Sequence, residues 1–171
     1  MAGNKYLKLS SGQLAEEAAV QASAGAGDAG KIPALDAAGK LANSMMPVGI
    51  GPDTKSMVAS EALAANDLVN VYNDAGTEKC RKADATNGRR ANGFVLDSVA
   101  GGGAAVATVY TRGTVTGLSG KTPGAVQYLS STAGLMTATA PSTAGYLVQE
   151  VGAAISPTEV AFEPKSPITL A

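Results

Sequence analysis

Apolar and polar residues alternate along the second part of the chain, from about residue 56 onwards, in short runs separated by turn residues. The longest run of β-favouring residues without proline spans residues 104–120. Between residues 106 and 116, one set of alternate positions is small and mostly apolar and includes Ala107, Val109 and Val115, whereas the other set mixes in polar groups. Because successive side chains of a strand point to opposite faces, this run predicts a central strand with one face turned inward.

The central strand is expected at residues 104–116. Shorter runs of the same kind predict further strands at residues 57–60, 68–72, 79–83, 93–99, 126–130, 135–137, 146–151 and 158–162. The sequences NDAG at 73–76 and STAG at 131–134 suit hairpin loops, because Gly and Asx residues tolerate positive φ. The clearest alternation, at 158–163, places Val160 and Phe162 on one face. Strands separated by turn signals at such short intervals predict a compact antiparallel β-barrel or sandwich domain over residues 56–171.

Residues 1–55 have a different character, with many Ala and Gly and few β-branched residues. High helix propensity at 11–23, with Glu16 and Glu17 near its N-terminal end and the sequence AGAGDAG after it, predicts a short helix. The following imperfect repeat, DAGKIPAL and then DAAGKLANSMMP, favours turns and extended pieces, and proline disfavours helix there. We therefore expect a mainly β protein whose domain follows an extended N-terminal arm.

The apolar residues of this arm follow no folded period, which suggests that they enter grooves on another surface. The candidate contacts are Leu14, Ile32, Leu35, Leu41, Met45 and Met46.

Composition narrows the possible functions. Of the 171 residues 45% are hydrophobic, but only 4% are aromatic, so the core is thin and association with other copies is expected. A net charge of −1 argues against nucleic acid and an anionic membrane as partners. No run of 18 apolar residues and no export signal is found.

The chain has no histidine and one cysteine, Cys80, which excludes zinc sites of the Cys/His kind and Ser/His or Cys/His pairs formed within this chain. We expect Cys80 to pack as a small apolar residue, and the aspartates near strand ends to serve as caps and turn residues. No catalytic residue, cofactor, metal site or small-molecule substrate is predicted, and we expect no enzyme activity.

A group of basic residues lies between positions 79 and 90. It consists of Lys79, Arg81, Lys82, Arg89 and Arg90. This group is either a contact patch for an acidic surface or a solvated strand and loop, since Glu78 and Asp84 are interleaved with it. Arg112, in the middle of the predicted central strand, needs solvent or a carboxylate of a neighbouring subunit.

The stretch DAGKIPALDAAGKLANSMMP resembles a linker of many tailed-phage structural proteins, in fibres and in head decoration proteins. The later stretches AANDLVNVYNDAGTEKCRKADA, RRANGFVLDSVAGGGAAVATVYTRGTVTGLSG and KTPGAVQYLSSTAGLMT resemble the β-rich domain of phage capsid decoration, or cement, proteins. The resemblance covers residues 25–171 and contains no catalytic signature. It implies a structural virion protein on the outer surface of the capsid, made in the host bacterial cytoplasm.

The resemblance also implies the partner and the assembly: the major capsid protein, bound by a homotrimer that clamps neighbouring capsomers. Alternatives are a tail-fibre or collar component, since the linker occurs in fibres, and a carbohydrate-binding adhesin module. The sequence lacks the sustained repeats or coiled-coil heptads that a fibre subunit would show. For an adhesin module, the chain has few aromatic side chains that could stack on sugar rings.

Overall fold

The structure, a computed structural model, describes residues 5–37, 39–46, 53–102 and 105–171. The chain divides into two compact units, unit 1 (Met1–Gly51) and unit 2 (Pro52–Ala171). Each unit is described by itself.

Unit 1 begins with a β-hairpin where the sequence predicted a helix. Strands β1 (Lys5–Ser10) and β2 (Gln13–Ala18) pair antiparallel, with Leu9 opposite Leu14. The prediction of a helix at 11–23 is therefore wrong. Ser11 and Gly12 have φ of 51° and 81° and form the tight turn, and two consecutive residues with positive φ match the twist of paired strands. The turn and the cross-strand ion pairs of Lys5 with Glu16 and of Lys8 with Glu17 outweigh the helix propensity of β2, since propensity is only a weak preference.

The other described residues of unit 1 are irregular and contain two short 3₁₀ helices, η1 (Ala26–Asp28) and η2 (Asn43–Met45). The segment predicted as an extended linker folds back on the hairpin's end. The Val20 N–H donates to the Ile32 carbonyl at 3.0 Å, and the Ala34 N–H donates to the Val20 carbonyl at 2.8 Å. Backbone bonds between distant residues thus close this part of unit 1 into a loop.

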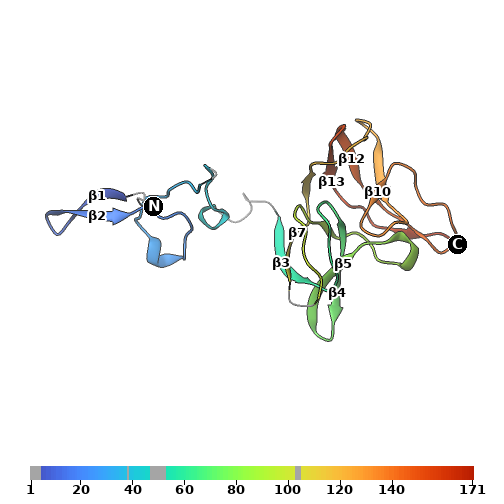
Figure 1. Ribbon diagram of the computed structural model, residues 1–171, viewed down its shortest axis with the longest axis horizontal. Coiled ribbons are helices and arrows are strands. Elements are labelled where there is room, and N and C mark those ends of the chain that lie inside the picture. Colours follow the sequence, from blue (N-terminus) through green and yellow to red (C-terminus); the bar gives the residue numbers. More distant parts are fainter. Residues whose placement is uncertain (1–4, 38, 47–52, 103–104) are drawn as a thin grey trace. The chain divides into compact units, whose positions relative to one another are not determined.

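Unit 2 is built from two main sheets (Figure 1). The first is a closed barrel in the order β3-β5-β4-β6-β7, formed by β3 (Thr54–Ala59), β4 (Leu68–Asp74), β5 (Thr77–Lys82), β6 (Gly93–Phe94) and β7 (Val106–Tyr110). Strands β3 and β5 are parallel, and the other pairs are antiparallel. The expected β-barrel or sandwich fold is confirmed.

The second sheet has the order β10-β9-β12-β13-β8. Its strands are β8 (Gly113–Val115), β9 (Val126–Leu129), β10 (Met136–Thr137), β12 (Glu150–Ser156) and β13 (Glu159–Phe162). A further pair joins β11 (Leu147–Val148) to β14 (Ile168–Thr169), and a 3₁₀ helix, η3 (Ala85–Asn87), lies between β5 and β6.

The prediction of a central strand is confirmed for its buried face, but it is wrong in treating the run as one continuous strand. Ala107, Val109 and Val115 are all fully buried, as the alternation predicted. However, the run divides into β7, which belongs to the barrel, and β8, which belongs to the second sheet, with a bend at residues 111–112. Residue 104, where the predicted strand begins, lies outside the described residues.

Two buried clusters form the core of unit 2. One fills the barrel around Met57, Val69 and Cys80, and the other packs the second sheet against the barrel. Phe94 connects the two parts, because its ring stacks on Tyr110 at 5.3 Å and meets Phe162 edge-on at 5.2 Å. A few aromatic contacts therefore hold together a core that is otherwise aliphatic.

Candidate functional site

The hairpin of unit 1 presents three leucines on one face. Cross-strand partners of an antiparallel pair lie on the same face, so Leu7, Leu9 and Leu14 point the same way. They are 69%, 72% and 75% exposed. This set, here called the leucine face, is flanked by the ion pair of Lys5 and Glu16 at 3.1 Å, whose residues lie on the same face by register. A two-stranded hairpin is only marginally stable alone. A partner surface that covers these leucines would therefore stabilise the hairpin as well as the complex between the two.

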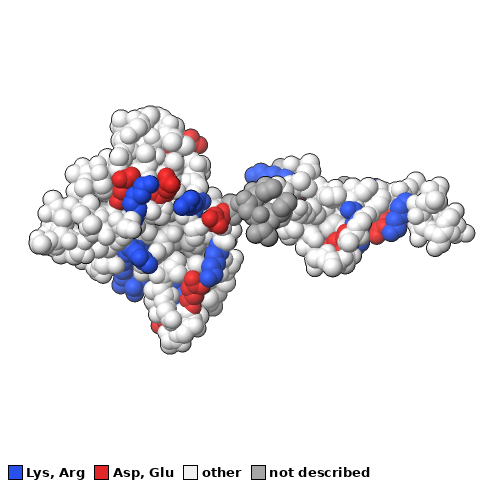
Figure 2. Space-filling model, turned by 180° about the vertical axis from the view of Figure 1, so that it is seen from behind, with Lys and Arg blue, Asp and Glu red and all other residues white. Residues whose placement is uncertain are grey.

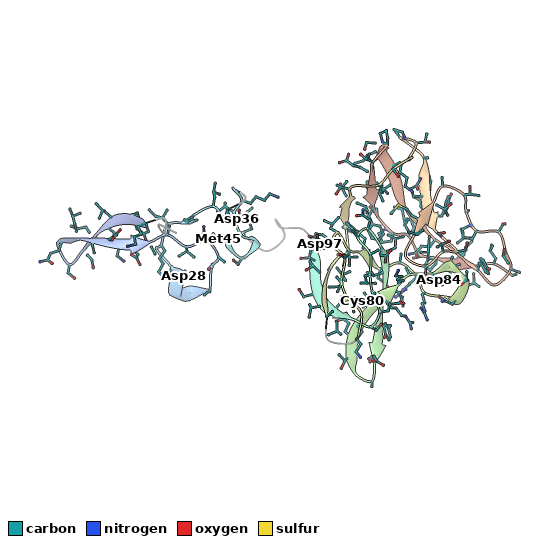
Figure 3. The ribbon with its side chains drawn as sticks, viewed as in Figure 1. Asp28, Asp36, Met45, Cys80, Asp84 and Asp97 are labelled. Atoms are coloured by element: carbon teal, nitrogen blue, oxygen red, sulfur yellow. The ribbon has the colours of Figure 1, made fainter. Side chains whose placement is uncertain are left out.

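The other predicted contact residues of unit 1 lie downstream of the hairpin. Ile32, Leu35, Leu41 and Met46 are exposed large apolar side chains. Met45 is half-buried and lines a cleft of about 220 Å³ together with Val20, Ser23, Asp28, Lys31, Pro33 and Ser44. Five of the six predicted residues are thus open to solvent, and Met45 is turned partly toward its own unit (Figure 3).

Side-chain hydrogen bonds fix the irregular segment that carries these residues. Asp28 accepts from the Ala24 N–H at 2.7 Å and from Lys31 Nζ at 2.9 Å, and these bonds, the backbone bond first, hold the Asp28 pKa below its ordinary value. Gln21 Nε2 donates to the Leu35 carbonyl at 3.0 Å. Ile32 and Leu35 are therefore held on an ordered loop while their side chains remain exposed.

Leu7 and Leu9 are not among the contact residues predicted from the sequence. The signal that could have found them is their two-residue spacing in KYLKLS, which is the period of a strand with one apolar face. In unit 2, Val106, Leu135, Ile155 and Ile168 are also exposed large apolar residues that the sequence analysis did not select.

The basic residues between 79 and 90 are mostly neutralised by neighbours. Lys79 pairs with Asp74 at 2.6 Å, Lys82 with the buried Asp67 at 3.2 Å, and Arg89 lies 4.0 Å from Glu61. Arg81 stacks over Tyr72, with its guanidinium carbon 4.1 Å from the ring centroid, and donates to Asn70 Oδ1 at 3.1 Å. Figure 2 accordingly shows basic and acidic side chains next to one another across one face of unit 2.

Within the described residues, Arg90 has neither an ion pair like those of Lys79, Lys82 and Arg89 nor a ring contact like that of Arg81. Within the described part of the chain its exposed guanidinium has no ion pair. The exposed Arg112, in the bend between β7 and β8, has none there either.

Cys80 and Asp84 have structural roles. Cys80 is fully buried inside the barrel (Figure 3), and desolvation raises its thiol pKa, which opposes formation of the reactive thiolate. Asp84 is the N-cap of η3 and accepts from the Thr86 N–H and hydroxyl, both at 2.8 Å. The expected packing of Cys80 and the expected capping role of Asp84 are confirmed.

Two features are absent from the described residues. No group of three or more His, Cys, Asp or Glu residues there is placed to hold a metal ion. No helix in those residues combines the length and the apolar character that crossing a bilayer requires.

Comparison with protein-family models, with curated proteins and with solved structures found no match for this chain.

Proposed function

We propose that this protein is a structural component of a tailed-phage virion, which decorates the head and stabilises it by joining neighbouring capsomers. The observation that carries the proposal is the apolar surface of unit 1, where seven large apolar side chains of the described residues are exposed: Leu7, Leu9, Leu14, Ile32, Leu35, Leu41 and Met46. The resemblance of the linker and of the β domain to phage decoration proteins supplies the identity of the partner, the major capsid protein.

The proposed mechanism is burial of this apolar surface on the shell. Removing apolar area from water contributes about 25 cal/mol per Å², and contiguous exposed apolar surface is typical of protein contact sites. Unit 2 has its own barrel and core, so it serves as the folded body that the bound unit 1 attaches to the head.

We also propose that the protein acts as a homotrimer. The exposed Val106, Leu135, Ile155 and Ile168 of unit 2 are candidate surfaces for contact between copies, and closure around an axis covers strand edges that would otherwise remain open. Three copies supply three apolar arms, and once one arm is bound the others bind at a raised effective concentration.

The test is binding of the full chain to purified heads that lack it. Leu7→Thr, Leu9→Thr and Leu14→Thr together keep β propensity and remove the apolar face, and we expect a loss of about 1 kcal/mol per leucine, so roughly 100-fold weaker binding per arm. The matched control replaces the exposed Ser10 and Gln13 by threonine; by register these residues lie on the opposite face of the same hairpin, so this variant should keep its binding.

Equal binding by the leucine-face variant and the unsubstituted chain would contradict the proposed role of the hairpin. Binding to tails and not to heads would favour the fibre or collar alternative.

A further inference from the structure

A cleft of about 270 Å³ in unit 2 brings together two basic residues from distant parts of the sequence. Its lining residues are Arg90, Ala91, Asn92, Gln149, Pro164, Lys165, Ser166 and Pro167. The segment around Arg90 lies between η3 and β6, and the segment around Lys165 follows β13. This set of residues is here called the cationic cleft.

On the Arg90 side of the cleft, hydrogen bonds fix the backbone, whereas side-chain N–H donors have no partner within the described residues. The Arg90 N–H donates to the Gly88 carbonyl at 3.1 Å, and the Arg90 carbonyl accepts from Asn70 Nδ2 at 3.0 Å. Asn92 Oδ1 accepts from Asn70 Nδ2 at 3.2 Å and from the Val71 N–H at 3.0 Å. The Asn92 amide oxygen is therefore occupied, whereas its Nδ2 group has no hydrogen-bond partner within the described residues.

The Lys165 wall is also anchored by its backbone. The Lys165 N–H donates to the Glu150 carbonyl at 2.9 Å, and prolines at 164 and 167 restrict the segment on both sides. The ammonium lies 3.8 Å from Glu163 Oε2, and both side chains are more than half exposed. An ion pair of that length in solvent contributes little, so Lys165 is available to another anion.

Gln149 joins the two walls. Its side chain is 2% exposed. Its Oε1 accepts from the Ala91 N–H at 2.7 Å, and its Nε2 donates to the carbonyls of Ala91 and Lys165, both at 3.0 Å. One buried side chain thus sets the spacing of the two basic segments, and sites whose walls are fixed in advance lose less entropy on binding.

We propose that the cationic cleft binds an oxyanion, of the carboxylate or the phosphate type. Arginine offers a planar fork of N–H donors that matches both groups, and hydrogen bonds between ionised partners are about twice as strong as neutral ones. Lys165 supplies a second positive charge, and the Asn92 amide and the Ser166 hydroxyl add neutral donors. Glu163, which is not among the lining residues, lies 3.8 Å from the Lys165 ammonium and competes for it.

The experiment is an NMR titration of the full chain with sodium acetate and, separately, with inorganic phosphate, each at constant ionic strength against sodium chloride. We expect saturable shifts at the amides of Asn92, Lys165 and Ser166. The double variant Arg90→Gln and Lys165→Gln should bind at least tenfold more weakly, and Glu163→Gln should bind several-fold more tightly because the competing carboxylate is gone. Saturation by acetate alone assigns the carboxylate type, and saturation by phosphate alone assigns the phosphate type.

The matched control is Arg112→Gln, which removes an exposed arginine without an ion pair in the described residues, outside the cleft. It should leave both titrations unchanged. Because the substituted side chains are solvent-facing, the variants should keep the dispersed spectrum of the folded chain, which the same spectra verify. Shifts that are equal in chloride, or that persist in the Arg90 and Lys165 double variant, would overturn the proposal.

Discussion

Gly152 in β12 is the position where a single methyl group should damage unit 2 most clearly. It pairs with Phe162 of β13 and with Gln127 of β9, and it has φ of 146°. A Cβ atom built on Gly152 would lie 1.9 Å from the carbonyl oxygen of Ala161, whereas real Cβ atoms essentially never approach another atom more closely than 3.0 Å. The clashing atom belongs to the backbone, so a rotamer change cannot relieve the contact.

The cost of Gly152→Ala has two parts. A non-glycine residue in this region of φ costs about 1–3 kcal/mol. Moving β13 away from β12 by the ångström or more that the clash demands weakens ladder hydrogen bonds worth about 1 kcal/mol each. We therefore expect a loss of about 3–5 kcal/mol in the free energy of unfolding of unit 2, which is a large part of the stability of an ordinary domain.

Urea denaturation of the full chain, followed by circular dichroism and by tyrosine fluorescence since the chain has no tryptophan, measures this loss. The matched control is Gly145→Ala, at φ of 83° with no atom within 4 Å of the added methyl, which should cost about 1 kcal/mol. If both variants lose the same stability, the close approach of β12 and β13 at Gly152 is not as described.

Three further predictions follow from other features. A chain of residues 53–171 should keep the melting temperature of unit 2 and lose head binding. The deletion has to stop before Asp53, because the Asp53 carbonyl accepts from the Thr111 N–H at 2.8 Å. Aggregation of this shorter chain would show that unit 1 belongs to the core. The folded protein lowers the pKa of Glu17, chiefly through its hydrogen bond to Lys8, and the pKa of Asp28. Unit 1 should therefore keep this stability at pH values above the ordinary pKa values of the two carboxyl groups and lose it as the pH falls through their lowered pKa values. Amide exchange in unit 1 that stays unchanged down to about pH 2 would contradict this prediction. Cys80, buried and with a raised pKa, should react with a thiol reagent at neutral pH only after unfolding in urea, and rapid stoichiometric labelling of the native chain would disprove its burial.

The alternation of side chains was enough to predict most strands of unit 2 and their inward faces. Val160 and Phe162 are both buried, and the loops at 73–76 and 131–134 connect paired strands. Such features depend on neighbours in the sequence, which a strand's two-residue period reports directly. The same period continues across the bend at residues 111–112, so it could not show that β7 and β8 belong to different sheets.

The misassigned helix shows the limit of propensity. The Gln, Leu, Ala and Glu residues of β2 favour helix, but propensity is a weak preference that turn geometry and pairing override. The turn at Ser11 and Gly12 was readable as a hairpin signal.

The candidate sites depended on tertiary structure to different degrees. The apolar residues between 32 and 46 were visible in the sequence because they lack a folded period, whereas Leu7 and Leu9 were not selected. The cationic cleft was not, because Arg90 and Lys165 meet only through the buried Gln149. Likewise, the sequence could not tell which basic residues between 79 and 90 have acidic neighbours.

We propose that this chain decorates a phage head through unit 1. A cryo-EM reconstruction of the phage particle that contains the protein tests it most directly. We expect density for unit 2 on the outer surface of the capsid, in groups of three, with the leucine face and the exposed residues of 32–46 lying against shell subunits. Density confined to the tail, or unit 1 projecting into solvent without touching the shell, would contradict the claim.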